Sequence, residues 1–94
     1  MGRIADRVYT DQTEITRLEL RTEELPDEAV VELMLVDGTR VTGVVVVRPT
    51  IQTFRDPEGC EGINGLVRID ELHSGHSRYL WLDSIQKVTA LGSA

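Results

Sequence analysis

Three side chains with metal-binding or nucleophilic chemistry lie in the second half of the chain: Cys60, His73 and His76. Thiolate and imidazole groups are common zinc ligands, and the two histidines have a tolerable spacing. Asp70 or Glu71 could supply a fourth ligand. Structural zinc sites usually carry paired Cys or His residues on both sides, whereas Cys60 stands alone. We therefore expect no metal here, and interpret these residues as a loop thiol and two turn histidines.

Cys60 paired with a histidine could also act as a nucleophile, which requires a stabilised thiolate. Its neighbours Glu58 and Glu61 disfavour a second negative charge. Gly59, Gly62 and Gly65 recur every third residue, but they precede a predicted strand, and a phosphate-binding loop needs a helix N-terminus. The sequence thus predicts no catalytic residue, no cofactor and no enzyme, and it predicts a flexible loop around these glycines.

Composition and charge further restrict the class of protein. The 94 residues are 40% apolar and 28% charged, which is typical of one small globular domain. The net charge is −6, and −4 of it lies in the first 29 residues. Proteins bind nucleic acid largely by neutralising phosphates, so an acidic chain argues against general nucleic-acid binding. One cysteine excludes an internal disulfide, and no apolar run approaches 18 residues, so we expect a cytoplasmic protein that does not span a membrane.

The elements that must position these residues begin with an arm and a helix. We expect residues 1–9 to form a loosely packed arm and residues 10–25 a helix. Asp11 and Glu14 have the spacing of a capping box, and Pro26 ends the helix because it lacks an N–H. Apolar residues at Ile15 and Leu18 start one narrow helical face. An alternating strand through residues 18–20 is the alternative for this segment.

The rest of the chain, residues 30–91, reads as a β-barrel. Asp37-Gly38 between two β-rich runs is a strong hairpin signal, and Gly43 interrupts the second run where a strand bends sharply. Residues 56–65 read as a long, mobile connection. Trp81 is expected in the core. The predicted strands are 30–36, 39–48, 50–55, 65–71, 78–83 and 85–91, and the last two could be one chain that turns a barrel corner at Ser84.

Residues 31–43, with their apolar alternation, Asp-Gly turn and bend glycine, resemble the first half of the first motif of the Sm-like (Sm, LSm and Hfq) proteins. Residues 63–70, with Asn64, resemble its second half, and residues 81–88 occupy the place of the second motif. The arrangement is similar to a small, uncharacterised bacterial family of Sm-like variants. The resemblance implies a mostly β, strongly bent five-stranded barrel with an N-terminal α-helix, in one domain over residues 1–94. Another small five-stranded barrel, of the SH3-like or oligonucleotide-binding kind, is the alternative fold.

The same resemblance implies a degenerate RNA site. Asn64 takes the place of the residue that reads a uridine edge in this family. Gly62 falls where the stacking side chain belongs and offers no face to a base, although stacking contributes about 1–3 kcal/mol per base. Leu82-Asp83 or Trp81-Leu82 falls where the family carries cations, and a carboxylate there repels phosphate. Residues 49–61 also enlarge the connection beside the expected pore.

Three functions follow from these observations. The first is a binding module that contacts RNA through Asn64, with the strand cations gathered into a cluster: Arg40, Arg48, Arg55, Arg68, Arg78 and Lys87. The second, which we prefer, is a non-catalytic module that assembles into a homo-oligomer through its edge strands. The third is an enzyme, which no motif supports. The sequence identifies no protein partner and no role for Cys60 or the 56–65 loop.

Overall fold

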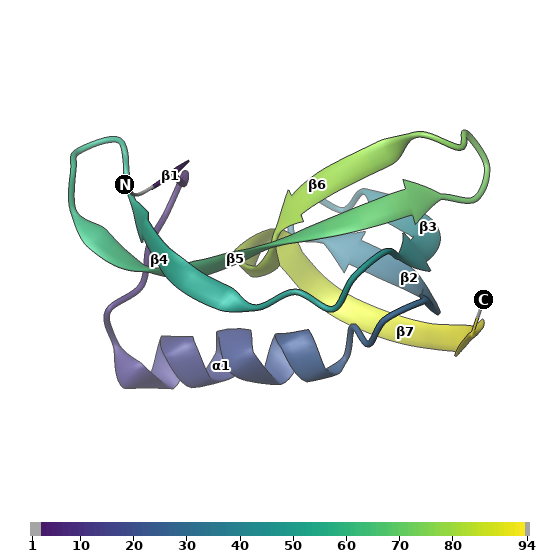
Figure 1. The fold of residues 1–94 in the computed structure, drawn as a ribbon, viewed down its shortest axis with the longest axis horizontal. Coiled ribbons are helices and arrows are strands. Elements are labelled where there is room, and N and C mark those ends of the chain that lie inside the picture. The colour runs from purple at the N-terminus through teal and green to yellow at the C-terminus, as the bar shows by residue number, and fades with distance from the viewer. Residues whose placement is uncertain (1–2, 94) are drawn as a thin grey trace.

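The computed structural model describes residues 3–93 and shows one helix and a strongly bent β-sheet (Figure 1). The elements in chain order are β1 (Arg3–Ile4), α1 (Gln12–Glu23), β2 (Ala29–Leu35), β3 (Arg40–Val45), β4 (Ile51–Arg55), β5 (Glu61–Glu71), β6 (Ser77–Trp81), the 3-10 turn η1 (Leu82–Ser84) and β7 (Ile85–Ser93).

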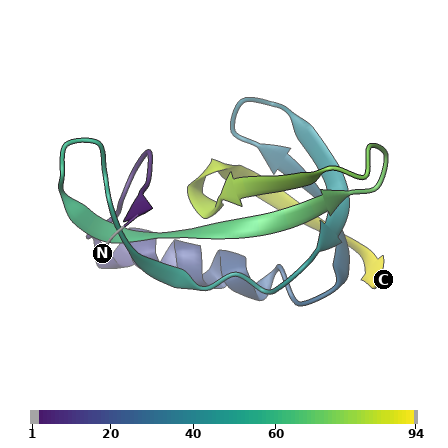
Figure 2. The same cartoon turned by 45° about the horizontal axis from the view of Figure 1, so that its top comes forward.

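The eleven-residue strand β5 organises the sheet, and Figure 2 shows it crossing the length of the molecule. Its first half pairs with β4, from Gly65 opposite Ile51 to Glu61 opposite Arg55. Its second half pairs with β6 and with β3, and β2 then joins β3 to β7. The strands therefore form a bent sheet that is not closed into a full barrel, and the predicted mostly β architecture with an N-terminal helix is confirmed.

The hairpin between β2 and β3 forms at the predicted turn. Gly38 has φ +89°, which favours glycine, and the Asp37 carboxylate accepts a 2.9 Å hydrogen bond from the Thr39 amide. Alternate residues of β2 are buried, so one face of this strand builds the core. That core is aliphatic, as expected from a chain with four aromatic residues.

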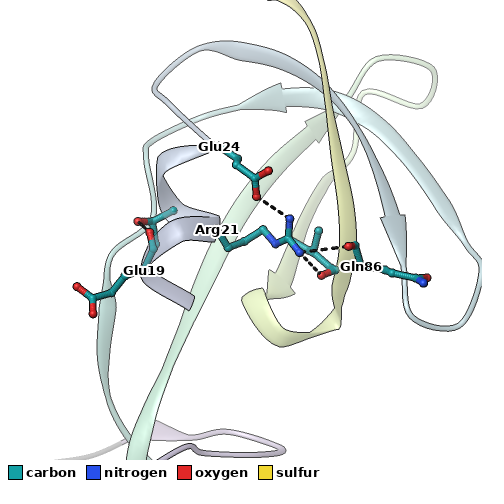
Figure 3. A network of polar contacts seen from close by, with 6 residues as sticks. Glu19, Arg21, Glu24 and Gln86 are labelled. Carbon is teal, nitrogen blue, oxygen red and sulfur yellow. Dashed lines mark hydrogen bonds and ion pairs between the residues drawn. The ribbon is translucent and has the colours of Figure 1, made fainter. Parts of the chain in front are cut away.

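Helix α1 lies along the sheet on the core side of β5. Asp11 caps it by accepting a 3.3 Å hydrogen bond from the Glu14 amide, as the spacing predicts. Leu18 enters the core, and Arg21 fixes the helix to the start of β7. The Arg21 Nη2 donates to the carbonyls of Ile85 and Gln86, at 3.2 Å each, while Nη1 contacts the Glu24 carboxylate at 2.6 Å (Figure 3).

The structure corrects the prediction of a loosely packed arm. Residues 1–2 lie outside the described residues, but the rest of the arm packs against the sheet. β1 pairs in parallel with β4, and the buried Ala5 donates its amide to the Arg55 carbonyl at 2.8 Å. Tyr9 exchanges two backbone hydrogen bonds with Ile63, at 2.9 and 2.7 Å. These non-local bonds could not be predicted from the weak local pattern of residues 3–9.

Two further expectations are wrong. The connection predicted over residues 56–65 is only residues 56–60, because Glu61 already begins β5. Trp81 is half-buried outside the core cluster, edge-on to Phe54 with ring centroids 5.0 Å apart. Its neighbours Leu80 and Leu82 fill the core instead. Side chains alternate along a strand, so when Leu80 and Leu82 face the core, Tyr79 and Trp81 face the other way.

Within residues 3–93, helix α1 is too short to cross a membrane, and no other helix is long and apolar enough.

Candidate functional site

Asn64 lies in the middle of β5 and is fully buried, with 0% of its surface exposed. Both amide protons are used: Nδ2 donates to the Arg7 carbonyl at 2.9 Å and to the Asp83 carboxylate at 3.2 Å. The Oδ1 atom accepts from the Gly65 amide at 2.8 Å. The side chain thus holds the arm, β5 and η1 together, and no donor is left for a nucleobase while the arm is in place.

Asp83 is the second member of this network. Its Oδ2 accepts a 2.9 Å hydrogen bond from the Tyr9 hydroxyl, while its Oδ1 receives the Asn64 amide. Burial, together with the adjacent Asp83 carboxylate, raises the pKa of Tyr9 above its usual value of 10.0. The network therefore ties a half-buried carboxylate to two neutral donors on different segments, and it leaves little room for an anion such as phosphate.

Gly62 explains why the arm can lie so close to β5. A Cβ atom at this position would lie 2.9 Å from the Tyr9 carbonyl oxygen and 2.9 Å from the Val8 Cβ. The glycine is thus required by the close approach of the arm backbone. The sequence indicated that Gly62 lacks a stacking side chain, but it did not indicate that the arm occupies the space beside this glycine.

The three positions assigned from the second motif serve packing. Leu82 is buried against Gly65, Trp81 packs on Phe54, and Asp83 binds Asn64. The structure therefore brings Asn64 and Asp83 into a contact that the arm covers.

Three of the six cations named for the predicted cluster form ion pairs in the described part of the chain. Arg55 contacts Glu61 at 3.3 Å, Arg68 contacts Asp70 at 3.4 Å, and Arg78 contacts Glu71 at 3.3 Å. Each pair is partly exposed, so it contributes at most about 1 kcal/mol to stability, but it removes a free charge from the surface.

Cys60 and the two histidines lie far apart. Cys60 is exposed in the turn before β5, where its amide donates to the Asp56 carboxylate at 2.9 Å. His73 and His76 are exposed in the turn after β5. Among residues 3–93, no three His, Cys, Asp or Glu side chains form a group that could hold a metal ion.

Three strands pair on one side only in the described part of the chain: the two-residue β1, which pairs with β4, and the longer strands β6 and β7. β6 pairs only with β5, and β7 pairs only with β2. Each carries an exposed large apolar side chain: Tyr79 on β6 is 63% exposed and Leu91 on β7 is 54% exposed. Unpaired strands present rows of N–H and C=O groups to other chains, so these edges are candidate interaction surfaces.

Comparisons with known proteins agree with this fold. The strand order and bend define an Sm-like protein, and a structural match supports this: the protein XC5848 from Xanthomonas campestris, described as adopting a novel variant of the Sm-like motif. It is 42% identical, covers 95% of this chain and 97% of its own, and superposes with a TM-score of 0.88. Residues 2–91 match the model of a domain of unknown function, DUF3247, and the chain belongs to that family. No curated protein matches the sequence significantly.

The raised pKa of Tyr9 predicts an alkaline stability effect. The surroundings of Tyr9 favour its protonated hydroxyl in the folded state. The resulting stabilisation is complete below pH 10 and is lost as the pH rises through the folded-state pKa of Tyr9. We expect Tyr9→Phe to be less stable than wild type at pH 7, with the difference shrinking above pH 10. Urea unfolding at pH 7 and pH 11 measures this, with the exposed Tyr79→Phe as control. A constant difference at both pH values would contradict the Tyr9–Asp83 interaction.

Proposed function

We propose that this protein is a non-catalytic Sm-like assembly module that forms a homo-oligomer through strands β6 and β7. The observation that carries the proposal is the pair of open edges, each bearing an exposed apolar side chain. Open edges with exposed apolar groups favour pairing with another chain, and within residues 3–93 no strand pairs with them; Arg21 of α1 contacts only the first two carbonyls of β7.

The two edges belong to different strands, which favours a head-to-tail contact. β6 offers five residues and β7 offers nine. A contact between two different surfaces repeats from copy to copy, so it produces a ring if the rotation closes and a filament if it does not. A closed ring leaves no free edge, and we therefore expect a defined oligomer.

The proposal assigns no chemical step to the protein. The groups that could perform one, Cys60 and the two histidines, lie at opposite ends of β5. Nucleophilic catalysis needs the base within hydrogen-bond reach of the nucleophile.

RNA binding of the Sm type is the alternative function. It is disfavoured because the arm covers Asn64 and because both amide protons of Asn64 are donated to the Arg7 carbonyl and the Asp83 carboxylate. Titration of a labelled oligo-uridine at low and physiological salt tests it. A micromolar or tighter affinity that weakens with salt would promote RNA binding over assembly, since phosphate contacts release counterions.

Leu91→Lys tests the strand-edge contact. A lysine on an edge strand opposes pairing with another chain, because its charge must then be buried or paired. We expect Leu91→Lys to reduce the native mass toward that of one chain, measured by light scattering after size exclusion. Leu72→Lys is the matched control: Leu72 is equally exposed, at 54%, but lies in the turn after β5. Equal masses for the two variants would contradict the proposal.

A further inference from the structure

A groove of about 250 Å³ crosses the outer face of β5, between β6 and the segment that joins β3 to β4. Leu66 and Arg68 form part of its lining from β5, and they alternate with Val67 and Ile69, which belong to the core. The groove therefore lies on the face of β5 turned away from the core. None of its lining residues is acidic; those that the argument uses are Val47, Arg48, Leu66, Arg68 and Tyr79.

The size of the groove favours a protein side chain over a small-molecule ligand. Ligand pockets usually measure about 300–1,000 Å³ and enclose most of the ligand, whereas this groove is smaller and open. Val47 and Tyr79 are two of the most exposed apolar residues, and both line it. Exposed apolar groups that converge on one hollow are typical of an interaction surface.

Charge restricts the occupant further. Within residues 3–93 the Arg48 guanidinium makes no hydrogen bond or ion pair; only its backbone amide is bonded, to Asp27. Arg68 already contacts Asp70 and Ser77. In a chain of net charge −6, the groove thus combines apolar side chains with neutral polar groups and one cation that has no ion pair in the described residues. Such a surface is complementary to an apolar side chain flanked by carboxylates.

The outer face of α1 carries that combination. Leu20 is a large apolar residue, yet 56% of its surface is exposed. Glu19 precedes it, and Glu23 lies one turn further along the same face. Neither glutamate side chain has an ion pair within residues 3–93, and Figure 3 shows Glu19 pointing away from the Arg21–Glu24 pair.

We propose that the groove receives Leu20 of α1 from a second copy of this chain, with Glu23 of that copy paired to Arg48. This contact goes beyond the strand-edge assembly, since it needs no strand pairing at β6 or β7. Leu20 and Glu23 lie on α1 whereas the groove lies on β5 and its neighbours, so the contact joins two different surfaces of the chain. The contact is therefore head-to-tail and continues from copy to copy.

One competing arrangement lies within a single chain. Arg48 also borders a second hollow, which it lines together with Glu19 and Glu23 of its own chain. These groups are not within ion-pair distance, but a shift of side chains could bring them together. The test must therefore separate pairing within a chain from pairing between chains.

The experiment uses two charge-reversal variants, Arg48→Glu and Glu23→Arg, measured alone and as an equimolar mixture by sedimentation velocity. Each variant alone carries like charges at the contact, and we expect its self-association to weaken about tenfold or more. In the mixture, every contact between unlike variants is again matched, so association should return to the wild-type level. Pairing within one chain cannot be restored by mixing.

Three comparisons complete the test. Arg48→Gln removes the charge without adding repulsion, so it should weaken association even if Arg48→Glu disturbs folding. Arg55→Glu, at an arginine that does not line the groove, should keep the wild-type association. Wild-type association of both charge reversals, or no recovery in the mixture, would overturn the groove contact. If Leu91→Lys alone then lowers the mass, the strand-edge proposal survives while this inference fails.

Discussion

Gly43→Ala is expected to destabilise the fold by about 3 kcal/mol or more, the upper range for overpacking a close-packed interior. A Cβ atom at Gly43 would lie 2.4 Å from the Asp70 carbonyl oxygen and 2.6 Å from the Ile69 Cγ2. The first of these is backbone, so it cannot move without separating β3 from β5 at the bend. Urea unfolding followed by circular dichroism measures the loss, and the melting temperature should fall by more than about 10 °C.

Gly59→Ala provides the comparison for Gly43→Ala. Gly59 has φ +88°, which strains an alanine by about 1–2 kcal/mol, but a Cβ there meets no atom within 4 Å. The two variants therefore separate backbone strain from steric contact. A loss at Gly43 no greater than that at Gly59 would show that the bend tolerates a side chain, and that the crossing of β3 and β5 is looser than described.

Asn64→Ala is expected to cost about 3 kcal/mol, because it removes three hydrogen bonds in a buried place. The Gly65 amide and the Arg7 carbonyl lose their partners, and Asp83 loses one of its donors. An unsatisfied buried polar group typically costs about 1–3 kcal/mol. The free energy of unfolding from urea titration measures the effect.

The control for Asn64→Ala is Gln52→Ala. Gln52 lies directly opposite Asn64 on β4 and is exposed, so its loss should change stability by less than about 0.5 kcal/mol. If Asn64 served only to read a base, its replacement would leave stability unchanged. A stability loss at Asn64 equal to that at Gln52 would therefore contradict the structural role of this side chain.

Short-range signals predicted the elements whose causes are local. The Asp37-Gly38 turn, the Asp11 cap and the bend at Gly43 each depend on residues a few positions apart or on a glycine within a strand. These features need no knowledge of the rest of the molecule, which is why the helix and the first hairpin are close to their predicted bounds.

The errors arose where distant segments meet. Three glycines between residues 59 and 65 indicate a loop by local preference, since glycine weakens strands. Gly62 and Gly65 nevertheless lie in β5, where they pair with β4. They are glycines because the arm and Leu82 approach them too closely for a side chain. The packed arm follows from the same contacts. The apolar residues Val8 and Tyr9 indicate that the arm could cover part of the sheet. Nothing in the local sequence indicates which strand it covers.

The candidate site shows the same division. The resemblance assigned Asn64 to base reading and left Leu82-Asp83 or Trp81-Leu82 for the cation position. The hydrogen bond between Asn64 and Asp83 was not predicted. This network under the arm depends on Tyr9 and the Arg7 carbonyl, which lie more than fifty residues away in sequence from Asp83 and Asn64 respectively. The open edges of β6 and β7 likewise follow from strand order, which the sequence alone does not fix.

The native mass of the purified protein, measured by light scattering coupled to size exclusion, tests the assembly proposal most directly. We predict a defined oligomer several times the mass of one chain, because head-to-tail contacts satisfy both open edges only when more than two copies take part. A monomer at all concentrations tested would contradict the account. The outer edges of β6 and β7 would then stay unpaired in solution.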